Sequence, residues 1–209
     1  MKILNILESP PLPDDWDKAI YAKQGGYSAK IAYAKERAKK VGQGSSRVAF
    51  VIDYQGRKTV LKIAKNKKGL YQNEHEQEAL SDYYLKQLKV FIPMIDYDKE
   101  SAQPSWLHVE FAEKVKESDF RKATGGSLDD LLSYVAHHAR PREEKDHWGN
   151  YQNVDSELEF VHDFETYVGN YPHHSIGDYA SPNNWGMYGG RPVIIDIGLS
   201  NEIMQQFYS

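Results

Sequence analysis

The chain has 209 residues, 40% of them apolar, with 26 Lys and Arg against 30 Asp and Glu, and it contains no Cys. This is the composition of an ordinary globular protein. The lack of Cys excludes a disulfide framework, a thiol nucleophile and Cys-ligated zinc or iron–sulfur sites. No apolar run approaches the ~18 residues that span a bilayer, and the first residues lack the pattern of a signal peptide. We therefore expect a cytoplasmic protein with no membrane span.

The charges are unevenly distributed along the chain. Residues 1–69 hold 15 Lys and Arg against 6 Asp and Glu, whereas residues 70–209 hold 11 against 24. A basic first third and an acidic remainder indicate two faces or lobes of opposite sign. The basic part could pair with the acidic part, receive nucleotide phosphates or meet nucleic acid. Because no recognition motif accompanies the charge, we do not expect a nucleic-acid-binding protein.

The first half of the chain predicts helices around a set of strands. Asp14 or Asp15 is expected to cap a short turn, and residues 28–41 are rich in helix formers, with Gly42 ending that helix. Two runs dense in β-branched and aromatic residues, separated by Gln55-Gly56, are typical of an antiparallel hairpin. The remaining expected elements are a helix over 70–89, with Leu80, Tyr84 and Leu88 on one stripe, and strands over 90–98 and 105–113.

The second half predicts mainly helices and one final strand. Ser127 is expected to cap a helix over 128–139, and residues 139–153 to form a polar loop. A second helix is expected to start at Asp155 or Ser156. Its apolar stripe is predicted to contain Leu158, Val161, Phe164 or Glu165, and Val168. A loop is expected from Pro172 through Gly186, and an apolar strand from Arg191 ends in Asp196 and Gly198.

Two features of the first half are candidates for ligand binding. The run from Gly42 to Val48 has glycines that let the backbone approach a ligand and N–H groups that can bind phosphate, although such glycines can equally close one element and start another. Lys62 shares a strand face with Val60 and Ala64, where an inward Lys needs an anionic partner. That partner could come from the acidic helix that follows, and a solvated Lys is the alternative. The glutamates of that helix are Glu74, Glu76 and Glu78.

The third candidate combines two carboxylates with an amide. Asp178 follows a glycine in a loop, Asn183 and Asn184 come five and six positions later, and Asp196 ends the apolar strand. One carboxylate can orient a hydroxyl, while an amide oxygen and the second carboxylate can hold Mg²⁺. This donor and acceptor set is the one that phosphoryl transfer requires.

The order of these motifs resembles that of a protein kinase or a small-molecule kinase of the same fold, over about residues 41–200. The motifs are GQGSSRV for the glycine-rich loop, VLK for the strand lysine, NEHEQEAL for the helix glutamate, LHVEFA for the hinge, GDYASPNN for the catalytic loop and DIG for the metal-binding motif. The set is also similar to kinase-like proteins of bacteriophages, in which GSSRVAF, KNKKG followed by QN, and a WG recur.

The resemblance implies a compact α+β, bilobal, protein-kinase-like fold. Its N-lobe would be an antiparallel sheet plus one helix, and its C-lobe helical and abbreviated, with ATP between them and Mg²⁺ as the metal. The implied domains are an N-terminal extension and helix over 1–41, an N-lobe over 42–113 and a C-lobe over 114–209. Only 11 residues follow Gly198, so we expect substrate to be held by the extension, the 139–153 loop or a second subunit.

The resemblance also implies a role for each matching residue. It assigns catalysis to Asp178, Lys62 and Glu76. It assigns nucleotide binding to Gly42, Gly44, Ser45, Ser46, Arg47, Val48, Lys62, Glu110 and Ala112. It assigns metal binding to Asp196 with Asn183 or Asn184, between which the sequence does not choose. Ile176 stands where these families carry a histidine.

Two functions follow as expectations. The first is an ATP- and Mg²⁺-dependent phosphotransferase with an unidentified acceptor, in which Asp178 is the base. The alternative is a pseudokinase, a kinase-like module of weak or no activity that captures a nucleotide or a host protein. If the chain is phage-encoded, it would act in the host cytoplasm.

Overall fold

The protein is an α+β structure with two compact units. The structure is a computed structural model that describes residues 17–139, 151–171 and 176–197. Unit 1 comprises the described parts of Met1–Gln77 and Met94–Phe111, and unit 2 those of Glu78–Pro93 and Ala112–Ser209. The boundaries expected at 41/42 and 113/114 divide the chain differently, because β1 (Lys39–Gln43) crosses the first one and Glu78–Pro93 belongs to unit 2. None of the helices in the described part of the chain is long and apolar enough to cross a membrane.

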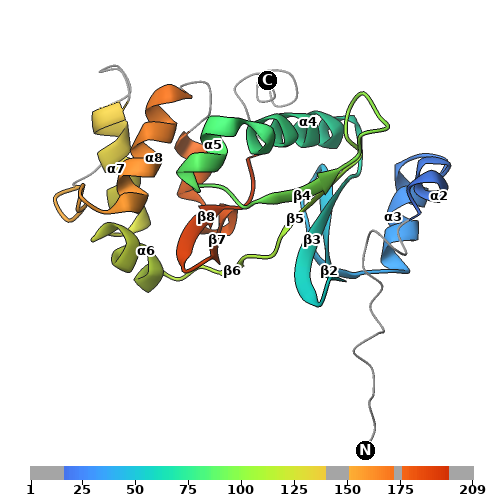
Figure 1. Cartoon of the computed structure of the whole chain (residues 1–209), viewed down its shortest axis with the longest axis horizontal. Coiled ribbons are helices and arrows are strands. Elements are labelled where there is room, and N and C mark those ends of the chain that lie inside the picture. The colour runs from blue at the N-terminus through green and yellow to red at the C-terminus, as the bar shows by residue number, and fades with distance from the viewer. Residues whose placement is uncertain (1–16, 140–150, 172–175, 198–209) are drawn as a thin grey trace, which may run out of the picture. The chain divides into compact units, whose positions relative to one another are not determined.

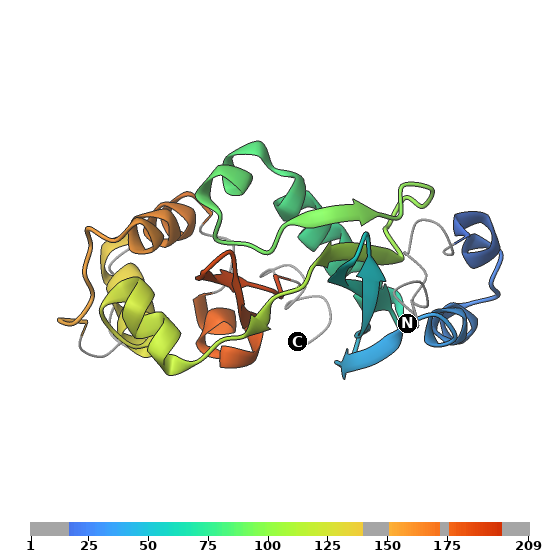
Figure 2. The ribbon, with the colours of Figure 1, turned by 60° about the horizontal axis from the view of Figure 1, so that its bottom comes forward.

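Unit 1 is built on a five-stranded antiparallel sheet with the strand order β1-β2-β3-β5-β4 (Figures 1 and 2). After β1, its strands are β2 (Arg47–Tyr54), β3 (Arg57–Ala64), β4 (Met94–Tyr97) and β5 (Trp106–Glu110). The predicted hairpin is confirmed, because β2 and β3 pair from Arg47↔Ala64 to Tyr54↔Arg57. Gln55 and Gly56 both have positive φ, 52° and 76°, which is the backbone of a two-residue hairpin turn.

The helix predicted over 28–41 is wrong in its second half. Helix α3 (Tyr27–Lys35) ends early, and Lys39–Gln43 forms β1, an edge strand that pairs with β2 from Lys39↔Val51 to Gln43↔Val48. Helix propensity is a weak preference that tertiary pairing overrides, and Lys is a common residue on edge strands. Gly42 therefore lies inside a strand and does not end a helix.

The N-terminal helices cover the sheet face that Phe50 and Leu61 share. Helix α2 (Lys18–Ala22) is capped by Asp17, whose Oδ1 accepts from Ile20 N at 2.9 Å; Asp14 and Asp15, the expected caps, lie outside the described residues. The rings of Tyr21 and Tyr33 pack edge to face, with their centroids 6.0 Å apart. With Ala34 they join one buried cluster with residues of the sheet. The sheet residues of this cluster are Val48, Phe50, Ile52, Leu61, Ile63 and Trp106.

The single helix expected over 70–89 is two helices. Helix α4 (Lys67–Ser81) ends before Asp82, which caps α5 (Tyr83–Leu88) by accepting from Tyr84 N at 2.8 Å and Leu85 N at 2.9 Å. The break rotates α5 relative to the periodicity of α4, so the expected stripe does not persist. Leu80 is 4% exposed whereas Tyr84 is 73% exposed.

Unit 2 contains four helices of more than five residues in its described part and a small antiparallel sheet. After α5, the helices are α6 (Glu117–Thr124), α7 (Leu128–Ala139) and α8 (Glu159–Asn170), and α7 and α8 lie side by side (Figure 1). The predicted cap of α7 is confirmed, since Ser127 Oγ accepts from Asp130 N at 3.0 Å. The sequence analysis did not predict α6.

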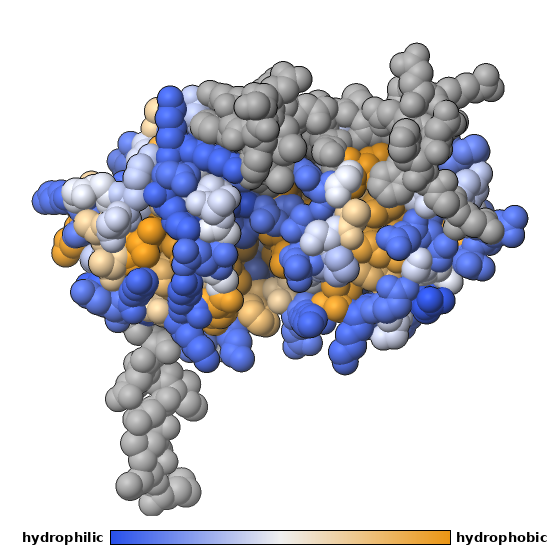
Figure 3. Space-filling view, turned by 180° about the vertical axis from the view of Figure 1, so that it is seen from behind, coloured by the Kyte–Doolittle hydropathy of each residue, from blue (hydrophilic) through white to orange (hydrophobic). Residues whose placement is uncertain are grey.

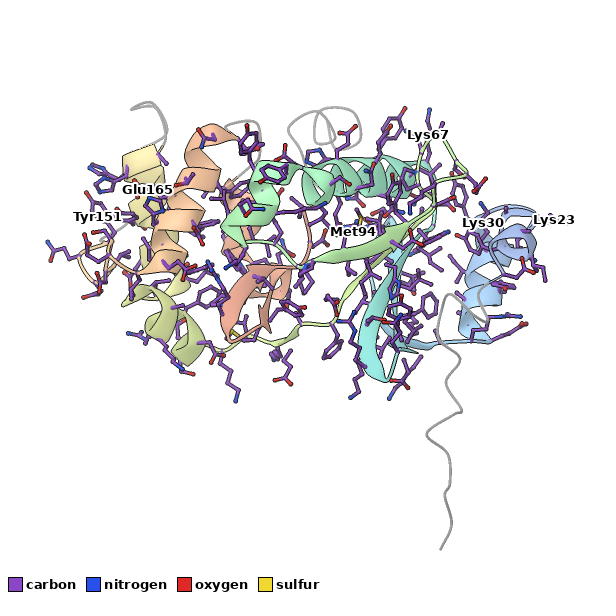
Figure 4. The ribbon with its side chains drawn as sticks, in the orientation of Figure 1. Lys23, Lys30, Lys67, Met94, Tyr151 and Glu165 are labelled. Carbon is purple, nitrogen blue, oxygen red and sulfur yellow. The ribbon has the colours of Figure 1, made fainter. Side chains whose placement is uncertain are left out.

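Helix α8 begins three residues later than expected. Leu158 is its N-cap residue, and Asp155 instead accepts from Glu157 N at 3.0 Å in the preceding turn. Of the two alternatives for its apolar stripe, Phe164 is fully buried and Glu165 accepts from the Tyr134 hydroxyl at 3.2 Å (Figure 4). The apolar periodicity therefore predicts the buried face of α8 well, and its start less well.

The segment expected as a loop up to Gly186 contains regular structure. Two short 3₁₀ helices, η2 (Ile176–Ala180) and η3 (Pro182–Asn184), precede β7 (Trp185–Tyr188). β7 pairs with β6 (Glu113–Lys114) and with β8 (Arg191–Ile194), the predicted final strand. The Trp185 indole donates to Tyr179 O at 2.7 Å, which fixes η2 against β7.

Figure 3 shows apolar patches separated by hydrophilic side chains. Among the described residues, the large hydrophobic side chains that are exposed are Ile20, Val41, Tyr83 and Tyr84.

The contact between α3 and the sheet can be tested with a buried and an exposed tyrosine. Tyr33 is 6% exposed in the unit 1 cluster and Tyr84 is 73% exposed. Removing a large buried aromatic ring costs about 3 kcal/mol or more, while an exposed one typically costs about 0.5 kcal/mol or less. Urea unfolding should therefore show a loss near the first value for Tyr33→Ala and near the second for Tyr84→Ala. Equal losses would contradict the packing described.

Candidate functional site

Lys62 and Glu76 form a buried ion pair in unit 1. The Lys62 ammonium contacts Glu76 Oε1, with Lys62 9% and Glu76 0% exposed. Among the three glutamates that the sequence offered, Glu76 is thus the partner of Lys62. The two neighbouring glutamates have other environments. Glu74 accepts a hydrogen bond from Gln103 Nε2 at 2.7 Å, and Glu78 is exposed. A buried Lys needs such an anionic partner, so the solvated alternative for Lys62 does not apply.

Arg47 is a second cation on the same carboxylate. Its Nη1 lies 2.5 Å from Glu76 Oε2 and 3.5 Å from Asn73 Oδ1. The Arg47 residue is 8% exposed. The sequence analysis placed Arg47 only in the nucleotide loop, because its partner is 29 residues away in sequence and no local pattern connects them.

The run from Gly42 to Val48 connects β1 with β2 through a tight turn. Gly42 is in β1, Gly44 and Ser45 are exposed, and Ser46, Arg47 and Val48 are buried. Gly44 N donates to Arg47 O at 3.0 Å. The four residues Gly44–Arg47, hereafter the loop, are therefore a closed turn at the end of the β1–β2 hairpin.

Three consecutive carbonyl groups of the loop accept hydrogen bonds from the connection between β3 and α4. Lys65 Nζ donates to Gly44 O at 2.8 Å, Asn66 Nδ2 to Ser45 O at 3.2 Å, and Lys65 N to Ser46 O at 2.7 Å. In a trans peptide the carbonyl and the next N–H point in opposite directions. The N–H groups of Ser45, Ser46 and Arg47 consequently point away from Lys65 and Asn66, and successive N–H groups on one side can bind an anion.

Glu110 and Ala112 lie at and beyond the end of β5. Glu110 is opposite Thr59 in the sheet, and its carboxylate pairs with Arg57 Nη1 at 2.5 Å. The ion pair with Arg57 thus engages the Glu110 side chain. Ala112 is half-buried, and a Cβ on Gly186 would lie 2.5 Å from the Ala112 Cβ. Only glycine permits this approach in unit 2.

Asp178, Asn184 and Asp196 come together through backbone and side-chain hydrogen bonds in unit 2. Asn184 Nδ2 donates to Asp178 O at 2.6 Å. Ile195 N donates to Asn184 O at 2.8 Å, which places the residue before Asp196 beside η3. The β7–β8 hairpin thereby returns the end of the apolar strand to the loop that carries Asp178.

The two carboxylates of this group interact electrostatically. Burial, and secondly the negative charge of Asp196, raise the pKa of Asp178 to about 6. Neighbouring carboxylates repel each other when both are ionised, and a bound cation would relieve that repulsion. The structure therefore brings together the predicted Asp178 and Asp196.

The oxygen atoms of this group are of the kind that could hold Mg²⁺. In the described ranges, no set of three or more His, Cys, Asp or Glu could hold a metal ion. Mg²⁺ typically takes one or two carboxylates plus phosphate oxygens and water. Asn184 is half-buried and held through its Nδ2 atom, so its Oδ1 is the atom that could serve as a ligand, whereas Asn183 is exposed. The geometry thus favours Asn184.

Comparing the sequence with protein-family models and with curated proteins gives no match.

The raised pKa of Asp178 predicts a pH dependence of stability. Its pKa is higher in the folded protein, about 6, than its ordinary value of 3.8. The folded state therefore binds the extra proton between these values, and the contribution of Asp178 to stability decreases as pH rises from about 4 to about 6. Asp178→Asn removes this titration. Its free energy of unfolding, relative to wild type, should rise over that interval.

Urea unfolding of both proteins at pH 4, 5, 6 and 7 measures this difference. Asp129→Asn, at an exposed position of α7, is the control for the chemical change itself. A pH-independent difference for Asp178→Asn would contradict the electrostatics of this group.

Proposed function

We propose that the protein is an ATP- and Mg²⁺-dependent phosphotransferase of the protein-kinase-like fold that acts on a hydroxyl acceptor. The observation that carries the proposal is the buried contact of Lys62 with Glu76. The resemblance singles out Glu76 among three acidic residues of α4, and a contact with Glu74 or Glu78 would have removed that assignment. The α+β architecture with an antiparallel sheet is compatible with the proposal.

Unit 1 would supply the groups that bind the nucleotide. The Lys62 ammonium, oriented by Glu76, would neutralise phosphate charge. The loop N–H groups of Ser45 and Ser46 would donate to phosphate oxygens. The backbone from Glu110 to Ala112 would meet the adenine, consistent with the engagement of the Glu110 side chain by Arg57.

Unit 2 would supply the metal ligands and the base. Asp196 and the Oδ1 atom of Asn184 would hold Mg²⁺, which would neutralise phosphate charge during phosphoryl transfer. Asp178 would orient the acceptor hydroxyl and take its proton as the oxygen attacks the γ-phosphorus. The bond from that phosphorus to the bridging oxygen then breaks and ADP leaves. A pKa of about 6 suits a group that accepts a proton near neutral pH.

A pseudokinase is the second candidate, and Ile176 favours it. This side chain is 7% exposed and occupies the position at which the resembling families carry a histidine. A buried apolar residue there preserves the packing of η2 while removing a polar group from the catalytic loop. Such a protein would bind a nucleotide or a host protein without turnover.

Two assays separate these candidates. Thermal unfolding with and without Mg·ATP tests binding, since a ligand at ~100 times its dissociation constant stabilises by about 2.7 kcal/mol. Incubation with γ-labelled ATP and a host lysate tests transfer. Label on an acceptor supports the phosphotransferase, and stabilisation without transfer supports the pseudokinase. If Mg·ATP neither stabilises the protein nor labels an acceptor, nucleotide binding is rejected altogether.

Asp196→Ala tests the metal assignment. Asp196 follows the end of β8 and is exposed, so its loss should leave the fold intact. We expect the variant to lose the tightening of ATP binding that Mg²⁺ provides, because a principal oxygen ligand is gone. Isothermal titration with ATP, with and without Mg²⁺, measures this, with Asp129→Asn as the folded control. Unchanged Mg·ATP affinity in folded Asp196→Ala would reject the assignment.

Asp178→Asn tests the base. The variant should bind Mg·ATP as wild type does but transfer phosphate roughly 10²–10⁴-fold more slowly, the usual contribution of a positioned acid or base. The structural alternative is that Asp178 only stabilises its own turn, in which case melting temperature falls and the rate per folded molecule does not. Melting temperature, affinity and rate should be measured on one sample. Undiminished transfer by folded Asp178→Asn would exclude the role.

A further inference from the structure

We propose that Arg47 is a positioning residue that joins the loop to α4 and holds Glu76 against Lys62 before any nucleotide binds. The inference rests on the proposed function and adds a role for a side chain that need not touch the nucleotide. Its basis is a set of reciprocal contacts between Gly44–Arg47 and α4, each made inside unit 1.

In the first set of these contacts, side chains of the loop bind side chains of α4. Arg47 contacts Glu76 at 2.5 Å and Asn73 at 3.5 Å, and the hydroxyl of Ser46 donates to the Gln72 side chain. All three partners on α4 are buried: Gln72 is 6% exposed, and Asn73 and Glu76 are 0% exposed. The side of α4 that carries these three residues is therefore polar and buried, and two adjacent loop residues, Ser46 and Arg47, contact it.

In the second set of contacts, residues just before α4 bind the backbone of the loop. Lys67 marks the first turn of α4 in Figure 4, and Lys65 and Asn66 just before it donate to three loop carbonyls. Asn66 Oδ1 also accepts from Gly69 N at 3.0 Å. A Cβ on Gly69 would lie 2.2 Å from Ser46 O, so only glycine allows α4 to approach this closely. The helix cannot move away from the sheet without breaking contacts to the loop.

Arg47 is suited to fix the orientation of the Glu76 carboxylate as well as its location. Lys62 contacts Oε1 and Arg47 contacts Oε2, so each oxygen has its own cation and the plane of the carboxylate is set. The guanidinium is a rigid planar fork, whereas an ammonium is a point charge on a flexible stem. Buried ion pairs are often retained for structural specificity more than for net stability. Without Arg47, Glu76 could rotate and Lys62 would lose its fixed partner.

The test compares amide hydrogen exchange of wild type, Arg47→Met and Arg47→Lys without nucleotide. In Arg47→Met we expect exchange in the peptide covering α4 to accelerate at least tenfold while α7 keeps its protection. Arg47→Lys should be intermediate, since it restores the charge but not the fork. Saturating Mg·ATP should restore α4 protection in Arg47→Met, with a weaker affinity than that of wild type. Arg121→Met, at an exposed position of α6, is the control and should match wild type.

The proposal is overturned if α4 exchanges in Arg47→Met at the same rate as in wild type. It is also overturned if α4 and α7 lose protection equally, because that indicates general destabilisation. If Arg47→Met does not fold, Arg47→Lys decides: faster α4 exchange alone supports the proposal and unchanged exchange overturns it. The proposed function fails separately, if wild type does not bind Mg·ATP; accelerated α4 exchange would then still support the structural role of Arg47.

Discussion

The burial of one carboxylate, that of Glu76, determines how α4 is attached to the sheet of unit 1. An ionised group that is 0% exposed is tolerated only with charged or hydrogen-bonding partners, and here these come from two adjacent strands, as Lys62 of β3 and Arg47 of β2. The position of α4 follows from this requirement. The opposite face of the sheet is apolar and is covered by α2 and α3. Apolar packing therefore attaches the helices on that face, whereas charged and polar contacts attach α4 on the other.

In unit 2, a hairpin and hydrogen bonds, rather than a buried ion pair, bring the acidic residues together. A short hairpin, β7 and β8, returns the chain to η2 and η3, and hydrogen bonds through Asn184 connect the segments that carry Asp178 and Asp196. Burial, and secondly the repulsion from Asp196, raise the pKa of Asp178. That electrostatic cost is what a bound cation would remove. The two units thus each present charged groups of the kind that nucleotide chemistry needs, a cation in unit 1 and carboxylates in unit 2.

Local patterns predicted the elements whose signals are local. The hairpin around Gln55-Gly56 and the Ser127 cap of α7 depend on residues within a few positions. Strand β1 was missed because Lys39–Gln43 has helix-favouring neighbours and becomes a strand only by pairing with β2. The Lys62–Glu76 contact could be anticipated from motif order, whereas the Arg47 contact could not, since it depends on the final docking of α4. Asp82, a good cap within a helical pattern, was the available signal for the end of α4.

The most direct measurement is Mg·ATP binding by isothermal titration to wild type, Glu76→Gln and Glu78→Gln. The two substitutions are chemically identical and lie on the same helix, but Glu76 holds Lys62 and Arg47 while Glu78 is exposed. The account predicts binding to wild type and to Glu78→Gln with equal affinity, and an affinity at least about tenfold weaker in folded Glu76→Gln, a difference of about 1.4 kcal/mol. Equal affinities in all three proteins, or no binding to wild type, would contradict it.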